Sequence, residues 1–355
     1  MLRLVFTGDI MLARRIGEKL ESFGYMEEAI FSPGILEKLS QADLVVGNLE
    51  CPLTKKGEKL GETSFKAHPD AIHTLRKFHH FSFANNHIFD CGKKGAKETM
   101  EVLTKYGKSF SGIGNKEQIY STQRIKGKEV SFISCAVNYC IKNETKESPF
   151  ILAANNPKIS AAIKEIKEKN KESLVVVLIH GGNEMIPYPE PSFRRQCREY
   201  IDAGADVVVS NHSHVLGGEE KYKKGIIFYS LGDFVFDGQS YLRRSSGILY
   251  LKFDKVFEWE LIPTQIEKDL RTSLSSDKDA KIILKGWQKR TKIYKKSNYD
   301  YIYRQLYLRS LLFFQLDRIF FLIRNKGIFV TIKFVLSKLS LLSFYFKKVS
   351  KRKIS

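Results

Sequence analysis

Hydrophobic and polar positions alternate in blocks over roughly the first two thirds of this chain. Short runs of branched apolar residues, such as residues 44–46 and 174–179, predict buried parallel strands. Segments with helical spacing separate these runs, and we expect helices at residues 69–78, 94–105, 159–168 and 192–203. A repeated strand–helix–strand order predicts an α/β fold with right-handed crossovers.

A second group of strand-like runs has no helix between its members. It comprises residues 130–135, 226–229, 247–253 and 257–262. These runs predict either a sheet with an antiparallel margin or two facing sheets. The polar stretch at residues 269–280 is typical of a connecting segment. We therefore expect a domain at residues 1–268, a linker at 269–286 and a helical extension at 287–355.

The extension is strongly basic. It contains 17 Lys or Arg and two Asp, and so supplies +15 of the net charge of +20. The apolar run at 328–346 approaches the length of a membrane span but contains Lys333 and Lys338. A lysine at the bilayer centre costs about 2.5–3.5 kcal/mol. We therefore expect amphipathic helices on an anionic membrane surface; a helical cap on the α/β core, or a dimer face, is the alternative. The basic anchor would be Lys347, Lys348, Lys351, Arg352 and Lys353.

Two further features bear on the cellular compartment. Met1 leads directly into the first strand-like run, without the charged and apolar regions of a signal peptide. The five cysteines are irregularly spaced and form no Cys-x-x-Cys pair, so we expect reduced, buried thiols. Both features predict a cytoplasmic protein, placed by its basic extension at the inner face of the cell membrane.

Residues able to bind a metal follow several of the predicted strands. They are Asp9, Glu50, Asn86 with His87, His180, and His212 with His214. Each residue alone is weak evidence for a metal site. An Asp after Gly is more often a helix cap, and a lone His is more often a hydrogen-bonded residue of the core. Carboxyl ends of strands in an open α/β sheet meet in one crevice, however, so these side chains are expected to converge. Carboxylates, an amide oxygen and imidazoles suit one or two divalent ions, with Mn, Fe, Zn and Mg as the candidates.

The motifs around these residues resemble the CapA family, the poly-γ-glutamate capsule synthesis group within the calcineurin-like metallophosphoesterases. The resemblance covers roughly residues 1–240 and implies a layered sandwich of two facing mixed sheets flanked by helices. Its motifs are Gly8-Asp9-Ile10-Met11-Leu12, Asn48-Leu49-Glu50, Ala84-Asn85-Asn86-His87-x-x-Asp90-x-Gly92, His180-x-Gly182-x-Glu184, His212-x-His214 and Tyr229-Ser230-Leu231-Gly232.

The resemblance also implies roles for single residues. One metal ion would bind Asp9, Glu50 and His214, and a second would bind Glu50, Asn86, His180 and His212. His87 would protonate the leaving group or stabilise the transition state, while Asp90 orients its ring. The expected substrate-binding residues are Arg14, Arg15, Asn48, Asn85 and Glu184, with the arginines suited to carboxylate or phosphate oxygens.

Several positions depart from the family pattern, including Ser210-Asn211-His212-Ser213-His214 in place of Gly-His-His-Pro-His. Met11 stands where metallophosphoesterases usually have a ligand His, and Glu50 replaces the bridging Asp, a role for which Asn48 is an alternative. Gly181 replaces a Trp. Asp233 replaces an Asn and adds a carboxylate near the crevice.

These observations support two functions of different classes. The first is a metal-dependent hydrolase of capsule or exopolymer biosynthesis, acting on a phosphoester or on an amide bond of a polyglutamate-like polymer. The second is a non-catalytic accessory protein that binds an acidic polymer or its membrane synthase. The expected partners are thus an acidic polymer or phosphorylated substrate, an anionic membrane surface and a polymer synthase. Nucleic acid is disfavoured because no known binding motif accompanies the basic and aromatic residues of 294–307.

Overall fold

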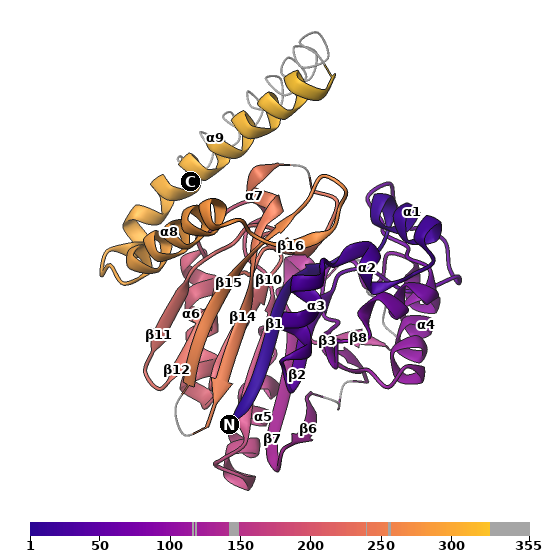
Figure 1. Cartoon of the computed structure of the whole chain (residues 1–355). Helices are drawn as coiled ribbons and strands as arrows, with labels where there is room; N and C mark the ends of the chain where they lie inside the picture. The colour runs from indigo at the N-terminus through magenta and orange to yellow at the C-terminus, as the bar shows by residue number, and fades with distance from the viewer. Residues whose placement is uncertain (116, 118, 142–148, 239, 255–256, 327–355) are drawn as a thin grey trace, which may run out of the picture. The chain divides into compact units, whose positions relative to one another are not determined.

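The computed structural model describes residues 1–115, 117, 119–141, 149–238, 240–254 and 257–326. The chain forms two compact units, Met1–Arg304 and Gln305–Ser355. The first unit contains both large sheets and all of the candidate site residues (Figure 1).

The first sheet has a parallel centre and an antiparallel margin. Its strand order is β16-β15-β14-β1-β2-β3-β4, and β13 pairs with the end of β1. Strands β1 to β4 and β13 run parallel, whereas β14, β15 and β16 are antiparallel to their neighbours. The bounds are β1 Leu2–Ile10, β2 Leu44–Leu49, β3 His80–Ser82, β4 Ser109–Ser111, β13 Asp233–Val235, β14 Ser245–Phe253, β15 Phe257–Ile266 and β16 Thr272–Leu274.

The second sheet is built in the same way. Its order is β11-β12-β10-β9-β7-β6, with four parallel strands between antiparallel edges. The bounds are β6 Ser121–Ile125, β7 Lys128–Ala136, β9 Leu174–His180, β10 Val207–Asn211, β11 Glu219–Tyr222 and β12 Gly225–Phe228. A small separate sheet pairs β5 (Ile113–Gly114) with β8 (Phe150–Ile151).

Helices cover the two sheets. α5 and α6 pack on the second sheet, and α8 packs against β11 of the second sheet and β15 of the first (Figure 1). The bounds are α1 Arg14–Phe23, α2 Glu27–Ile30, α3 Pro33–Ser40, α4 Gly92–Lys105, α5 Lys158–Lys169, α6 Pro191–Ala203, α7 Tyr241–Arg244, α8 Asp277–Tyr294 and α9 Tyr299–Lys326. Two 3₁₀ helices, η1 at Pro69–Leu75 and η2 at Asn138–Cys140, complete the described elements.

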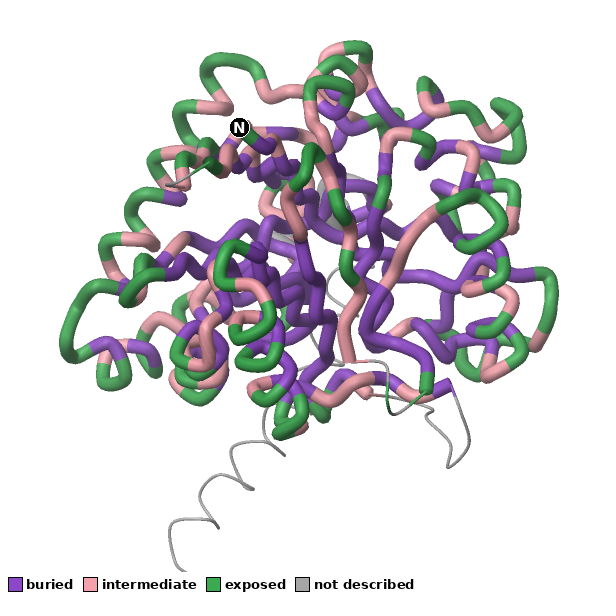
Figure 2. The backbone as a smooth tube through the Cα atoms, turned by 90° about the horizontal axis from the view of Figure 1, so that it is seen from below, coloured by how far each residue is buried: buried purple, intermediate pink, exposed green. Residues whose placement is uncertain are grey.

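The main hydrophobic core lies between the sheets, where buried strands run through the interior (Figure 2). Phe6 and Leu249 of the first sheet share this core with Phe132, Val176 and Phe228 of the second. Burying such side chains contributes roughly 1.5–3 kcal/mol each. Two facing mixed sheets flanked by helices confirm the fold class that the sequence predicts, including the antiparallel margin.

Two expected elements differ in the structure. The helix predicted at residues 69–78 is the 3₁₀ helix η1, and it begins at Pro69, whose ring suits a first helical position. The expected linker at 269–286 contains β16 and the first half of α8. Thr272 of β16 pairs with Ile266 along the edge of β15. The hydrophobic and polar pattern of the sequence does not reveal this pairing.

The beginning of the C-terminal extension packs on the core. Trp287 of α8 and the side chains of Tyr294 and Tyr299 are buried. The phenol of Tyr294 donates to the Pro187 carbonyl at 2.7 Å, and Tyr299 donates to the Pro189 carbonyl at 2.7 Å. Residues 287–304 thus form a helical cap, which is the alternative weighed for this extension.

The second unit begins within α9. Its described part exposes large apolar side chains, including Leu308, Leu312 and Phe313. Among the helices within residues 1–326, none has the length and apolar character that a membrane span requires. The run at 328–346 and the basic anchor at 347–353 lie outside the described residues.

Candidate metal centre

The structure brings the six expected ligands together where the two sheets meet. Asp9 lies near the end of β1, and Glu50 and Asn86 follow β2 and β3 of the first sheet. His180 is the last residue of β9, and His212 and His214 follow β10 of the second sheet. Contacts join the two groups directly. Asn86 Oδ1 lies 2.7 Å from His180 Nε2, and Asp9 Oδ2 lies 3.5 Å from His214 Nδ1. The convergence follows from the parallel strands, which all end at this edge.

The Glu50 carboxylate lies at the centre of the cluster. It is fully buried, and neither oxygen has a hydrogen-bond partner among the described residues. Its Oε1 lies 3.9 Å from His87 Nε2, 3.8 Å from His180 Nε2 and 3.9 Å from His214 Nε2. Burial, and then the charge of Asp9, raise the pKa of Glu50 well above its usual value. A buried carboxylate without hydrogen bonds is costly, and a divalent cation between it and the imidazoles would offset that cost.

Tight backbone packing places Asp9. Its N–H donates to the Gly232 carbonyl at 2.9 Å, where β13 meets β1. A Cβ at Gly8 would lie 1.8 Å from that same carbonyl oxygen, so only glycine fits there. The other side is also constrained, because His212 and His214 have φ values of 105° and 59°. Such positive values are uncommon for histidine and are found at functional sites, where surrounding packing enforces them.

His214 is held by a carboxylate that the sequence placed near the crevice. Asp233 Oδ1 lies 2.8 Å from His214 Nδ1, and Asp233 Oδ2 accepts a hydrogen bond from Arg243 Nε at 2.8 Å. Burial alone would lower the pKa of His214, but Asp233 and then Glu50 outweigh it and raise the pKa well above its usual value. The ligand atoms of Asp9, His214 and Asp233 lie within 4.8 Å of one another.

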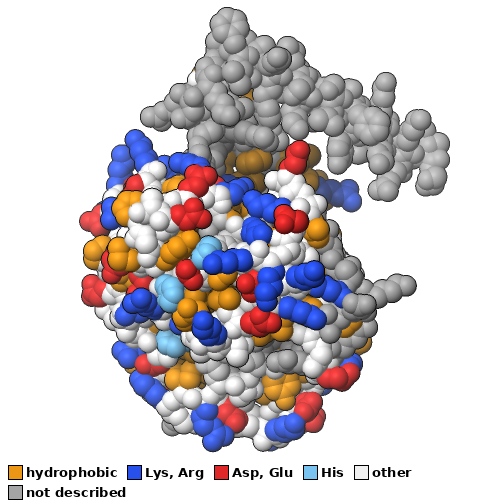
Figure 3. Space-filling view, turned by 90° about the vertical axis from the view of Figure 1, so that its right-hand side faces the viewer, with side chains coloured by type: hydrophobic (Ala, Val, Ile, Leu, Met, Phe, Trp, Pro, Cys, Tyr) orange, Lys and Arg blue, Asp and Glu red, His pale blue; other side chains and the backbone are white. Residues whose placement is uncertain are grey.

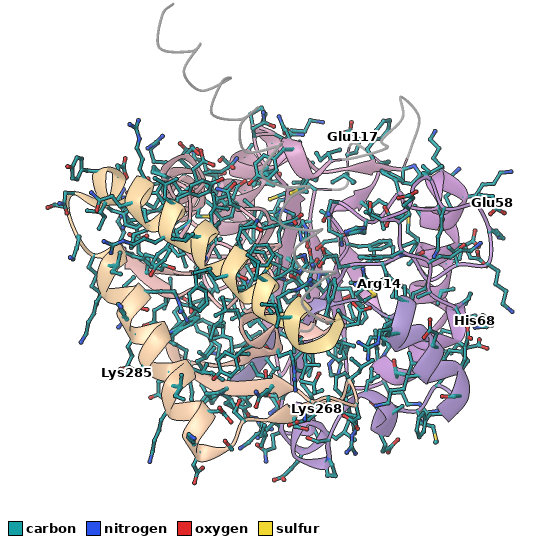
Figure 4. All side chains as sticks on the ribbon, turned by 90° about the horizontal axis from the view of Figure 1, so that it is seen from above. Arg14, Glu58, His68, Glu117, Lys268 and Lys285 are labelled. Atoms are coloured by element: carbon teal, nitrogen blue, oxygen red, sulfur yellow. The ribbon has the colours of Figure 1, made fainter. Side chains whose placement is uncertain are left out.

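His87 faces the cluster from the more open side. Its Nδ1 lies 2.7 Å from Asp90 Oδ2, which leaves Nε2 toward Glu50. The ring stacks on Phe65 at 4.0 Å between centroids, and the Arg14 guanidinium lies 4.8 Å from the centroid of the same Phe65 ring. Seen from above, Arg14 lies toward the middle of the molecule, whereas Glu58 lies at its margin (Figure 4). His87 and Asp90 therefore form the oriented pair that the resemblance implies.

The expected substrate-binding residues divide into two groups. Asn48 Nδ2 donates to Asp9 Oδ1 at 2.7 Å and lies 3.3 Å from His180 Nδ1, so this side chain joins the two sheets. Asn85 Nδ2 donates to the Leu49 carbonyl at 2.8 Å, and its Oδ1 accepts from the His87 N–H. Both asparagines thus hydrogen-bond to residues in or beside the cluster, and their substrate-binding role stays a prediction.

Arg15 and Glu184 lie on the surface of the first unit. Neither takes part in the contacts described for the ligand cluster within residues 1–304. Arg14, by contrast, reaches Phe65 and forms an ion pair with Asp237.

Two residues near the centre carry no sequence motif. Arg243 of α7 contacts Asp233, and Cys140 of η2 lies with His180 and His212 in a second group whose ligand atoms are within 4.8 Å of one another. From the sequence, Cys140 was expected only as one of five irregularly spaced thiols. All five cysteines are indeed buried and outside any disulfide. For Arg243 the sequence offers only its position ten residues after Asp233, and this spacing alone predicts no contact between them.

Comparison with known proteins agrees with the motifs. The family model described as "Bacterial capsule synthesis protein PGA_cap" matches residues 3–238. This chain belongs to that family. It is 31% identical over 287 residues to the capsule biosynthesis protein CapA of Bacillus anthracis, covering 75% of this chain and 68% of that protein. It is 30% identical over 292 residues to the PGA biosynthesis protein CapA of Bacillus subtilis, covering 77% and 73%.

Solved structures give a weaker likeness. A putative 5'-nucleotidase from Staphylococcus aureus has a TM-score of 0.44 and 14% identity over 81% of this chain and 58% of that one. A 5'-nucleotidase precursor from Thermus thermophilus has a TM-score of 0.43 and 15% identity over 83% and 60%. Likeness at this level carries no argument about the site of this PGA_cap protein.

Proposed function

We propose that this PGA_cap protein is a metal-dependent hydrolase that acts on an anionic substrate during synthesis of a capsule polymer of the poly-γ-glutamate type. The Glu50 carboxylate carries the proposal, because it is fully buried without a hydrogen bond and faces three imidazole nitrogens at 3.8–3.9 Å. That donor set fits divalent cations better than it fits a core made only of protein groups.

The residues around Glu50 would divide the chemistry between them. Asp9, Glu50, Asn86, His180, His212 and His214 would hold one or two divalent ions. Ions bound there would polarise a phosphoryl or carbonyl oxygen of the substrate and activate water. His87 would give a proton from Nε2 to the leaving oxygen or nitrogen, while Asp90 fixes the opposite ring nitrogen.

Two arginines support an anionic substrate. The guanidinium groups of Arg14 and Arg243 lie 5.6 Å and 4.6 Å from the centroid of the Phe236 ring, and that ring lies 4.9 Å from the His214 ring. Arg243 Nη2 is buried and has no hydrogen-bond partner among the described residues. A buried guanidinium with a free donor suits a carboxylate or phosphate oxygen. We propose that this oxygen belongs to the substrate.

The reaction can be tested directly. Purified protein should bind Mn²⁺ or Zn²⁺ and hydrolyse either an aryl phosphate ester or an oligo-γ-glutamate, and the preferred substrate identifies the bond. Glu50→Gln should abolish activity and metal binding together. Glu62→Gln, at an exposed glutamate, is the matched control. If the unchanged protein binds no divalent ion, the accessory function replaces the hydrolase.

We also propose that the second unit contacts an anionic membrane surface. Its described helix exposes Leu308, Leu312 and Leu316, which recur at four-residue spacing. Residues 305–355 contain 11 Lys or Arg and one Asp, half of the net charge of the chain. On the first unit, basic and acidic side chains are mixed over the face shown in Figure 3. A membrane position would place the centre beside a polymer synthase, in keeping with either a catalytic or an accessory role.

A further inference from the structure

We propose that Cys140 supplies a thiolate ligand to the ion held by His180 and His212, so that the two halves of the metal centre differ in chemistry. This inference rests on the proposed metal centre and deepens it, since it names the class of ion that one half selects. Neither the motifs nor the family resemblance assigns a metal to this cysteine.

The backbone delivers Cys140 to the centre. β7 pairs in parallel with β9, and Ala136 is in register with His180. The Val137 N–H then donates to the His180 carbonyl at 3.0 Å, and the Cys140 N–H donates to the Val137 carbonyl at 2.8 Å. The 3₁₀ turn η2 therefore folds over the end of β9, next to the imidazole that β9 presents.

Gly181 makes room for this turn. A Cβ at Gly181 would lie 2.7 Å from Val137 Cγ1 and 2.9 Å from Phe193 Cε2, so a larger residue would displace Val137. The turn is also fastened on its other side. Tyr139 Oη accepts from the Gly182 N–H at 2.8 Å and donates to the Gly182 carbonyl at 3.0 Å. The departure from Trp at residue 181 thus accompanies the approach of η2 to the site.

The geometry suits a shared ion. The sulfur of Cys140 and the ligand nitrogens of His180 and His212 lie within 4.8 Å of one another, and all three residues are buried. Zinc bond lengths of about 2.3 Å to sulfur and about 2.0–2.1 Å to nitrogen place tetrahedral ligand atoms roughly 3.3–3.6 Å apart. Small side-chain adjustments would bring the group to that spacing.

An independent observation supports a cation site beside this group. Glu50 Oε1 lies 3.8 Å from His180 Nε2, and the carboxylate is fully buried with no hydrogen bond among the described residues. Glu50 therefore adjoins both the group of Cys140, His180 and His212 and the group of Asp9, His214 and Asp233, through His180 and His214. Glu50 would thus be available as a ligand to either half of the centre.

The other cysteines lie in different surroundings. Cys51 accepts the Leu12 N–H at 3.2 Å, Cys91 contacts the Phe65 carbonyl at 3.5 Å, and Cys135 lies 3.6 Å from Tyr200 Oη. Cys140 is the cysteine that the described residues place in a group of possible metal ligands. Cys135, five residues earlier and equally buried, is its matched control.

Ligand chemistry then separates the two halves. A thiolate with two imidazoles favours Zn²⁺ or Fe²⁺, whereas two carboxylates with one imidazole accept harder ions such as Mn²⁺ or Mg²⁺. Ion binding would release the thiol proton of Cys140 to solvent. The centre would therefore hold a soft and a hard ion, or one zinc at the soft position when metal is scarce.

The test uses the full chain loaded with Co²⁺. The unchanged protein should show the near-ultraviolet thiolate-to-cobalt charge-transfer band. Cys140→Ser should lose the band and bind Zn²⁺ at least about tenfold more weakly, with a smaller change for Mn²⁺. Cys135→Ser should keep the band. X-ray absorption of the zinc-loaded unchanged protein should show one sulfur neighbour at about 2.3 Å, which needs no variant to fold.

The outcomes separate this inference from the proposed function. Two bound ions without a sulfur neighbour would overturn the role of Cys140 and leave the hydrolase standing. A band that persists in Cys140→Ser would likewise overturn it. If no divalent ion binds to the unchanged protein, both the metal centre and the role of Cys140 are wrong.

Discussion

His87 Nδ1 lies 2.7 Å from Asp90 Oδ2, and the same oxygen accepts the Phe65 N–H at 2.5 Å. A single carboxylate oxygen thus fixes both the imidazole and the residue whose ring stacks on it. This arrangement defines which nitrogen of His87 faces Glu50, and it makes the proton-donor role testable.

Replacing the members of this pair should reduce turnover without loss of metal. We expect His87→Ala to lower kcat by about 10²–10⁴-fold, the usual contribution of a positioned acid. Asp90→Ala should cause part of that loss, and the double variant should be no worse than His87→Ala, because the residues act as a unit. Steady-state kinetics and metal analysis provide the measurement. Additive losses would show that Asp90 does not act through His87.

Glu50→Gln should abolish the increase in the free energy of unfolding that added metal causes. Addition of Mn²⁺ or Zn²⁺ at about 100 times the dissociation constant should stabilise the unchanged protein by about 2.7 kcal/mol, whereas the variant should not respond. Thermal unfolding with and without metal gives the readout, with Glu62→Gln as the control. An unaltered metal response in Glu50→Gln would remove Glu50 from the ligand set.

Arg243→Lys should weaken substrate binding more than turnover. Lysine keeps the positive charge beside Asp233 but lacks the second donor that Nη2 supplies. Since a charge-assisted hydrogen bond contributes about 1.5–3 kcal/mol, KM should rise about 10- to 100-fold. Equal falls in kcat and kcat/KM would instead indicate an interaction made only in the transition state.

His80 should make the fold sensitive to acid. Its ring is buried against Phe132 and contacts Ser109 and Ser111, and burial lowers its pKa to about 3. Between about pH 6.5 and pH 3 the unfolded chain binds a proton that the folded chain does not, so stability falls with decreasing pH by about 1.4 kcal/mol per unit.

Denaturant unfolding at pH 7.5 and pH 5.0 measures this effect. We expect the difference between the two pH values to be about 2 kcal/mol smaller in His80→Gln than in the unchanged protein. His73→Gln, outside the sheets on η1, serves as the control. Equal pH dependence in His80→Gln and the unchanged chain would contradict the prediction.

The position of a C-terminal truncation should decide whether the protein folds. Removal of residues 305–355 should leave the first unit intact and abolish binding to anionic vesicles. Removal of residues 287–355 also deletes Trp287, Tyr294 and Tyr299, and loss of one buried aromatic side chain costs about 3–5 kcal/mol. Circular dichroism and vesicle sedimentation distinguish the two truncations. Vesicle binding by residues 1–304 would show that the second unit is not the membrane contact.

The strand ends were predictable because the fold itself brings them together. Asp9 and His180 follow apolar runs that are typical of parallel strands, and parallel strands end at one edge. The position of Asp233 was predictable only from the family pattern. Its distance from His214 depends on the approach of β13 to β1 at Gly8, which has no periodic signal.

Cys140 and Arg243 could not be predicted, because short elements deliver them. η2 has three residues and α7 has four, and the place of each depends on long-range packing. The same limit explains β16, whose polar Thr272 and Ser273 are paired through the edge of β15. Local sequence predicts structure poorly where pairing with a neighbouring strand or turn determines it.

The phenol groups of Tyr294 and Tyr299 contact the carbonyls of Pro187 and Pro189, and this affects how the chain folds as it is translated. The loop that follows His180 can form these contacts only after residues more than a hundred positions later have been synthesised. During translation the residues of the cluster therefore leave the ribosome well before the two tyrosines that fasten this loop. If the cluster binds ions as proposed, a nascent chain should acquire them late, after nearly the whole first unit has emerged.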